Sequence, residues 1–192
     1  MEIKEKAIIY SSFRQFSKYG YEKTSISDIY KEAGISKGLV YYYFKDKKEL
    51  YLKSLKYAIN KVSLEIDKYD FSSLDFLSRL ANITIVKLEF FLNNKNLIRF
   101  IESSTKEKSL SILKEVRKVL EKNHADSIKK IEEMIDYDRI EVDIPRDKVI
   151  DIINFTFSGA YNKASLLETE SERRKLVYLY KDILIKLLYE KR

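Results

Sequence analysis

The sequence predicts an all-α protein, and its composition gives the first reasons. The 192 residues contain only 4 Gly and 1 Pro, so few residues interrupt a helix. Hydrophobic residues make up 45% of the chain and charged residues 35%, which is typical of a packed rather than a disordered protein. We expect about nine helices, arranged as a small N-terminal three-helix domain with a helix-turn-helix and a larger C-terminal helical bundle domain.

Glycines and short polar residues mark the ends of the first two helices. The first helix is expected over 3–19, and Gly20 ends it because glycine readily takes a positive φ. Thr24 or Ser25 caps the start of the second helix, since their side-chain oxygens accept the free N–H groups of a helix N-terminus. Gly34 ends this helix and makes a tight turn.

The next two helices begin at polar caps as well. Ser36 caps a short third helix, whose inner face holds Val40 and Phe44. Asp46 then caps a long fourth helix, which is expected at about 47–68.

Beyond Asp70 the apolar residues still recur at three- and four-residue steps. The helices expected from this pattern span 71–93, 96–104, 106–135, 146–168 and 170–190. Pro145 suits the first turn of the helix that follows it, and Thr169 with Glu172 resembles a capping box.

Several classes of function are disfavoured by composition. There is no Cys, and His124 is the only histidine, so a thiolate or histidine metal site and a proton relay lack their ligands. We therefore expect no enzyme, no cofactor and no metal. The N-terminus has no signal-peptide pattern, and no apolar run reaches the roughly 18 residues of a membrane span. We expect a cytoplasmic, nucleoid-associated protein that does not bind membranes.

The segment TSISDIYKEAGISKGLVYYYFKDKKEL, residues 24–50, has the layout of a DNA-binding helix-turn-helix at about 25–44. In this motif the second helix enters the major groove. Lys37 stands at the tip of that helix, where a lysine reaches a guanine edge or a phosphate. Gly38 allows the backbone to approach DNA closely. The net charge of +7 agrees with an anionic partner, although a lysine-rich solvated surface explains most of it.

This segment resembles the TetR family of bacterial transcriptional regulators over about the first 55 residues. The resemblance is carried by Ala7, Phe16, Gly20, Thr24, Ile29, the run 33–38, Tyr41, Tyr43, Phe44, Lys47 and Leu50. Two residues depart from the family pattern. Leu39 replaces a common threonine, so one polar base contact becomes apolar, and Tyr30 replaces a small alanine between the two helices.

The resemblance and the free N–H groups at helix N-termini together indicate a set of DNA contacts. The expected DNA-binding residues are Thr24, Ser25, Ser36, Lys37, Gly38, Tyr41, Tyr42 and Lys47. Some of these also have a purely structural interpretation. Thr24 and Ser36 would serve as helix caps, Tyr41 as a core residue and Lys47 as an ordinary surface lysine.

The resemblance implies a DNA-binding domain at 1–50 and a ligand-sensing and dimerisation domain at 51–192. The expected function is a ligand-responsive repressor that binds a palindromic DNA operator as a homodimer. A hydrophobic or amphipathic small molecule would be its effector. Two alternatives are a ligand-independent architectural DNA-binding factor and a helical protein-interaction module.

Two further sets of residues are expected in the second domain. Aromatic and polar side chains near its apolar faces are candidates for a ligand pocket, namely Phe90, Phe100, His124, Phe155 and Asn162. The last two helices carry a wide apolar surface, which usually marks an interface. The expected dimer residues are Ile153, Phe157, Gly159, Tyr161, Tyr180 and Leu184.

Overall fold

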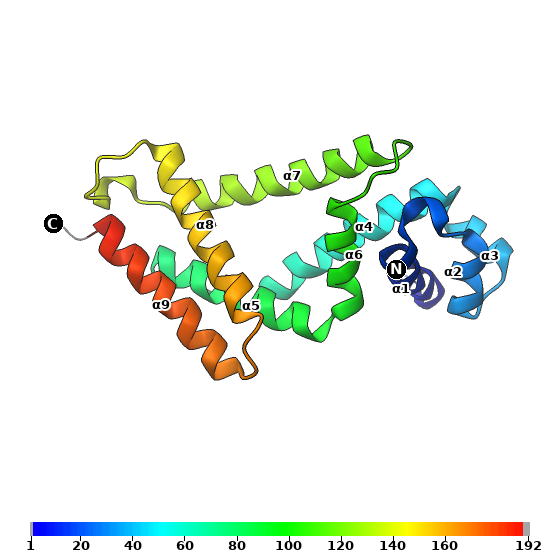
Figure 1. Ribbon diagram of the computed structural model, residues 1–192, viewed down its shortest axis with the longest axis horizontal. Coiled ribbons are helices and arrows are strands. Elements are labelled where there is room, and N and C mark those ends of the chain that lie inside the picture. The colour runs from blue at the N-terminus through cyan, green and yellow to red at the C-terminus, as the bar shows by residue number, and fades with distance from the viewer. Residues whose placement is uncertain (1, 190–192) are drawn as a thin grey trace. The chain divides into compact units, whose positions relative to one another are not determined.

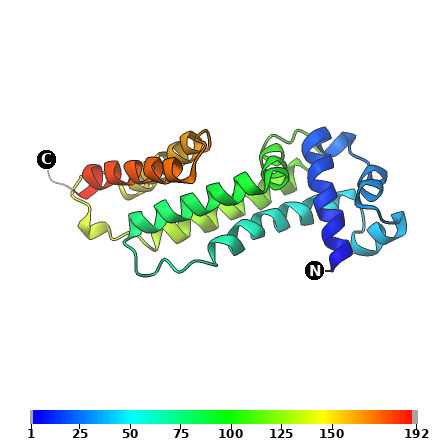
Figure 2. The ribbon, with the colours of Figure 1, turned by 90° about the horizontal axis from the view of Figure 1, so that it is seen from below.

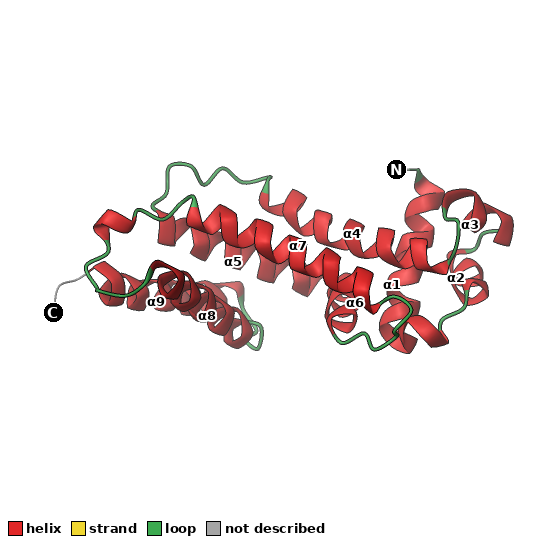
Figure 3. Ribbon diagram, turned by 90° about the horizontal axis from the view of Figure 1, so that it is seen from above, coloured by secondary structure: helices red, strands yellow, loops and turns green. Residues whose placement is uncertain are grey.

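The computed structural model describes residues 2–189, and every regular element within them is helical (Figure 3). The predicted all-α class is therefore confirmed. The helices are α1 (Ile3–Lys23), α2 (Ile26–Ala33), α3 (Lys37–Tyr43), α4 (Lys47–Ile66), α5 (Phe76–Asn93), α6 (Lys95–Thr105), α7 (Leu113–Glu132), α8 (Arg146–Ala164) and α9 (Glu170–Tyr189), with a 3-10 turn at Tyr137–Arg139 (Figure 1).

The chain packs as two compact units that interleave along the sequence. One comprises Met1–Ser63 with Asn94–His124, and the other comprises Leu64–Asn93 with Ala125–Arg192. Packing therefore does not divide the chain at residue 50, because α6 lies directly against α1 (Figure 2). The functional division at residue 50 remains a prediction.

An aromatic cluster between α1, α4 and α6 forms the core of the first unit. The rings of Phe13 and Phe100 stack with their centroids 5.2 Å apart, and Tyr51 packs edge-on against Phe16 at 4.7 Å. All four side chains are at most 1% exposed. A buried hydrogen bond of 2.8 Å between the hydroxyls of Ser12 and Ser54 also joins α1 to α4.

Most of the predicted signals at the helix ends are confirmed. Gly34 ends α2 with φ of 67°, whereas Gly20, with φ of 75°, kinks α1 and does not end it, because the helix continues to Lys23. Ser25 and Asp28 form a reciprocal capping box at the start of α2. Ser36 accepts the N–H of Leu39 at the start of α3.

Helices α5, α8 and α9 lie side by side and enclose the core of the second unit (Figures 1 and 2). Arg173 and Glu89 form an ion pair beside this core, and the Arg173 side chain is 7% exposed. The Arg173 guanidinium donates to both Glu89 oxygens, at 2.6 and 2.9 Å, and to the carbonyl oxygens of Leu167 and Glu168. This side chain thus ties α5 to α9 and to the turn before α9.

The starts of two helices were predicted too early. Helix α5 begins at Phe76 rather than at 71, because Asp75 accepts the N–H of Ser78 at 2.9 Å and so caps the helix there. Helix α7 begins at Leu113 rather than at 106. Before it, the Glu107 carboxylate accepts the N–H groups of Lys108 and Ser109, which draws this backbone away from a helical path.

Candidate nucleic-acid interface

Helix α3 turns one face to the core and the opposite face to solvent. Val40 is completely buried, and Phe44, directly after the helix, is 1% exposed. On the other face Tyr42 is 76% exposed and Tyr41 is 47% exposed. Tyr41 is therefore a surface residue and not a core residue. Gly38 is also exposed, and nothing lies within 4 Å of the position that a Cβ would take there.

Lys37 and Tyr41 form a pair on this exposed face. The Lys37 ammonium lies 5.9 Å from the centroid of the Tyr41 ring, one helical turn away. Attraction between the cation and the ring biases the lysine toward this face. The exposed face of α3 therefore presents a cation and two phenol hydroxyls together, which are donors suited to phosphates and to base edges.

The N-termini of α2 and α3 differ in charge. Ser36 is exposed, and its hydroxyl accepts the Leu39 N–H at 3.3 Å, so α3 begins without an acidic side chain in its first turn. At the start of α2, hydrogen bonds from Ser25 lower the pKa of the Asp28 carboxyl. That carboxylate already satisfies the positive end of the α2 dipole. The start of α3 is consequently the better place for a phosphate.

Thr24 is buried, and its hydroxyl points back into α1. It donates to the carbonyl oxygens of Gln15 at 3.1 Å and of Gly20 at 2.8 Å. The residue is 1% exposed, so the structure gives it a role in holding the end of α1. These bonds argue against the predicted phosphate contact.

Lys47, the predicted phosphate clamp, is also engaged within the protein. Its ammonium donates to the carbonyl oxygens of Tyr21, Glu22 and Thr24 at 2.9, 3.3 and 3.1 Å. It also lies 4.4 Å from the centroid of the Tyr21 ring. An ammonium has three N–H donors, and all three have partners here. The structure therefore favours a role in scaffolding over a phosphate contact.

Two contacts that sequence reasoning missed close the far end of α3. The Tyr43 hydroxyl donates to the Glu2 carboxylate, and this bond raises the pKa of Tyr43 to about 12. The Lys53 ammonium donates to the Tyr43 carbonyl at 3.4 Å and lies 5.4 Å from the Phe44 ring centroid. Glu2 and Lys53 are 41 and 10 residues away from Tyr43 in the sequence, so no pattern of neighbouring residues predicts these contacts.

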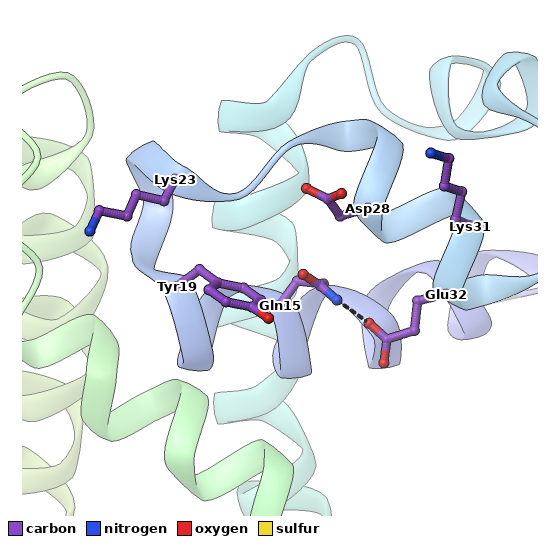
Figure 4. A pocket seen from close by; sticks show the side chains of 6 residues that line it. All are labelled: Gln15, Tyr19, Lys23, Asp28, Lys31 and Glu32. Carbon is purple, nitrogen blue, oxygen red and sulfur yellow. Dashed lines mark hydrogen bonds between the residues drawn. The ribbon is translucent and has the colours of Figure 1, made fainter.

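A shallow surface pocket lies between α1 and α2. Figure 4 shows its lining by Gln15, Tyr19, Lys23, Asp28, Lys31 and Glu32. Gln15 donates to Glu32 at 2.7 Å, and Arg14 forms an ion pair with the same acid. These contacts join α2 to α1.

Comparison with known proteins agrees with this geometry. Residues 8–53 match the sequence profile of the bacterial regulatory proteins of the TetR family. The chain is also 34% identical over 132 residues to YuxN, an HTH-type transcriptional regulator of Bacillus subtilis. The chain belongs to the TetR family. Its relatives are transcription regulators and not enzymes.

The family profile covers only residues 8–53, but the fold resembles that of solved TetR-family regulators along nearly the whole chain. A TetR-family transcription regulator from Marinobacter aquaeolei superimposes with a TM-score of 0.70 at 16% identity, over 98% of this chain and 96% of that one. FadR from Bacillus subtilis, solved in complex with stearoyl-CoA, gives 0.64 at 19% identity, over 97% and 99%. The alignment with YuxN covers 67% of this chain but 43% of YuxN. The chain spans less than two thirds of the length of the curated relatives it matches.

The structure does not gather the predicted pocket residues of this TetR-family chain around one cavity. Phe100 belongs to the aromatic core of the first unit. Phe155 is 74% exposed, and His124 and Asn162 are exposed as well. Phe90 is half-buried beside Phe91, with ring centroids 6.0 Å apart. The pattern of aromatic residues identified helix faces but not their partners.

The predicted dimer residues fall on two different faces. Ile153, Phe157 and Leu184 are at most 8% exposed and belong to the core between α5, α8 and α9. They cannot face a second protomer in this structure, because this unit's own helices cover them. Gly159, Tyr161 and Tyr180 are half-buried. The large apolar side chains that α8 and α9 leave exposed are Phe155, Leu179, Ile183 and Leu187.

No helix within residues 2–189 has the length and apolar character needed to cross a membrane. Within the same residues, no group of three or more His, Cys, Asp or Glu side chains is placed to hold a metal ion.

Proposed function

We propose that this chain is a DNA-binding transcription repressor that recognises a palindromic operator as a homodimer. The observation that carries the proposal is the exposed face of α3, where Lys37, Tyr41 and Tyr42 project from a helix whose other side is sealed into the core. A helix fixed in this way suits insertion into the major groove.

Roles within the interface follow from exposure and from bonding. Lys37 reads a base edge or a phosphate at the tip of α3, and Gly38 permits the close approach of the backbone. The hydroxyls of Tyr41 and Tyr42 donate to phosphates, and Ser36 presents the N-terminus of α3 to the DNA backbone. Ser25 is a weaker phosphate contact because of the adjacent Asp28. Thr24 and Lys47 are assigned to the scaffold that holds these groups.

The dimer is proposed to form through the exposed faces of α8 and α9. Leu179, Ile183 and Leu187 recur at four-residue steps on α9, and they are 54%, 48% and 40% exposed. Phe155 adds a 74% exposed ring on α8. An apolar surface of this kind normally marks an interface, and a two-fold arrangement uses the same patch on both subunits. The half-sites of a palindromic operator require that symmetry.

A small molecule is proposed to regulate this binding through the region 51–192. The supporting likeness is to FadR, whose crystallised ligand, stearoyl-CoA, joins a long apolar chain to a polar group. We infer a hydrophobic or amphipathic effector, acting on a protein in the cytoplasm. Such a ligand lowers operator affinity only as far as it prefers the state that does not bind DNA.

The test of the proposal is selection of binding sites from random double-stranded DNA by the full chain. We expect an enriched palindrome whose half-sites lie about one helical turn apart, roughly 34–36 Å. If the chain binds all DNA equally and no sequence is enriched, it is better described as an architectural factor. Absence of binding to any DNA would favour a protein-interaction module.

A further inference from the structure

The short segment 20–24, which consists of the end of α1 from the kink at Gly20 together with Thr24, is held from three sides. Its carbonyl oxygens accept the ammonium of Lys47 on α4, as described above. The Thr24 hydroxyl returns to the body of α1. The third side is the loop 106–112 between α6 and α7, which lies outside the part of the chain that matches the family profile.

Glu107 is the centre of this third contact. Its carboxylate accepts the backbone N–H of Tyr21 at 3.2 Å. It also accepts the N–H groups of Lys108 and Ser109 in its own loop, at 2.9 and 2.8 Å. The buried Tyr51 hydroxyl on α4 donates to the same carboxylate, and burial together with this negative charge raises the pKa of Tyr51. One carboxylate thus joins α1, α4 and the loop.

Two serines extend the contact to the next residue of the segment. The hydroxyls of Ser109 and Ser111 both donate to the Glu22 carboxylate, the second at 3.1 Å. These hydrogen bonds lower the pKa of Glu22 and so favour its charged form. Ser109 also accepts the N–H of Leu113 with its carbonyl, at 2.9 Å, which fixes the loop to the first turn of α7.

We propose that Glu107, Ser109 and Ser111 are positioning residues for DNA binding, which hold segment 20–24 and thereby set the orientation of α3. The inference rests on the proposed function. Helix α2 starts at Ile26, only two residues after the segment, and α3 is joined to α2 by the tight turn at Gly34. A displacement of the loop would therefore move both helices together. The loop is a point where a change in α6 or α7 reaches the DNA-binding surface.

The substitution Glu107→Gln tests the central contact with little change in volume. A glutamine amide has one acceptor oxygen and an NH2 group that only donates, so it cannot serve donors on both sides of the carboxylate. Glu102→Gln is the matched control, because Glu102 is an exposed acid on the preceding helix. The pair Ser109→Ala and Ser111→Ala tests the second contact. Ser103→Ala is its control, since that hydroxyl bonds only its own helix, at the Phe100 carbonyl.

The first readout is operator affinity by fluorescence anisotropy, with the active fraction measured by stoichiometric titration. We expect Glu107→Gln to raise Kd about tenfold, as follows if the DNA-competent orientation falls to about a tenth of the population. The slope of log K against log salt should stay at its wild-type value, because no phosphate contact is lost. The serine pair should act in the same direction, and both controls should bind like wild type. A wild-type Kd in the Glu107 and serine variants would overturn the proposal, as would a lower active fraction with unchanged Kd.

The second readout needs no DNA, and it separates this proposal from the proposed function. Amide hydrogen exchange of the peptide covering 20–29 should accelerate in Glu107→Gln and remain unchanged in Glu102→Gln. Unchanged exchange in Glu107→Gln would refute the positioning role even if operator binding is confirmed. Faster exchange in a chain that binds no operator would refute DNA binding, and with it the positioning role, while leaving the structural contact established.

Discussion

Lys47 offers the sharpest test of the structure against the family resemblance. As a phosphate clamp it would affect only the DNA complex, whereas its three bonds to carbonyl oxygens predict an effect on the free protein. The informative substitution is Lys47→Met, which removes the charge and the donors but keeps an unbranched apolar stem. Lys48→Met on the same helix is the control, because Lys48 makes one ion pair, with the partly exposed Glu115.

The expected loss of stability follows from the geometry of these bonds. Hydrogen bonds to a charged group contribute roughly 1.5–3 kcal/mol in favourable cases. The three bonds of Lys47 share one half-buried ammonium, which water would otherwise solvate, so we assign the whole set about 2 kcal/mol. The contact with the Tyr21 ring is included in that figure. For a chain of this length, this corresponds to a fall in Tm of about 4–8 °C. The Lys48 pair is screened by solvent, so its loss should lower Tm much less than the loss of the Lys47 bonds.

The assay combines thermal unfolding with the salt dependence of operator binding. Lys47→Met should lower Tm, and at a temperature where it is folded it should keep the wild-type slope of log K against log salt. A phosphate contact predicts the reverse, namely an unchanged Tm and a slope smaller by about 0.9 per protomer. That second outcome would refute the assignment of Lys47 to the scaffold.

Three further predictions concern stability, assembly and pH. Replacing Arg173 by Leu should cost about 2–3 kcal/mol in chemical denaturation, since the half-buried Glu89 would lose its partner, whereas Arg174→Leu at an exposed pair should cost less than about 1 kcal/mol. A smaller loss for Arg173 than for Arg174 would contradict the buried ion pair. Leu179→Glu should give a monomer by light scattering at micromolar concentration, and an unaltered dimer would exclude this face as the interface. The lowered pKa of Asp28 predicts a contribution to stability that is complete above the usual carboxyl range and is lost as pH falls through the folded-state pKa. The difference in Tm between wild type and Asp28→Asn should therefore shrink between pH 7 and pH 3, and a constant difference would rule the contribution out.

Features that depend on neighbouring residues were predicted well. Ser25, Gly34 and Ser36 act through hydrogen bonds or dihedral angles within a few positions, so their residue types suffice to place helix ends. The exposed surface of α3 followed in the same way, because successive helical residues point about 100° apart. The late starts of α5 and α7 were missed because Asp75 and Glu107 bind nearby N–H groups in competition with helical bonds.

Features that depend on distant partners were not predictable from one sequence. Helical periodicity identified an apolar face through Ile153 and Phe157, but it does not say whether that face meets the chain's own core or another protomer. Phe100 has the residue type of a pocket-lining group, yet it stacks on Phe13, which is far away in sequence. Lys47 matches the family at a position expected to contact DNA, and only the fold shows that three carbonyl oxygens surround its ammonium.

The most direct test of DNA recognition is the binding of Lys37→Ala to a selected operator and to every single-base variant of one half-site. If Lys37 reads a base, its removal should cost about 1–3 kcal/mol of binding free energy on the selected operator and relax the preference at one position in each half-site. Wild-type affinity and wild-type preference at every position would contradict the claim that the exposed face of α3 reads DNA.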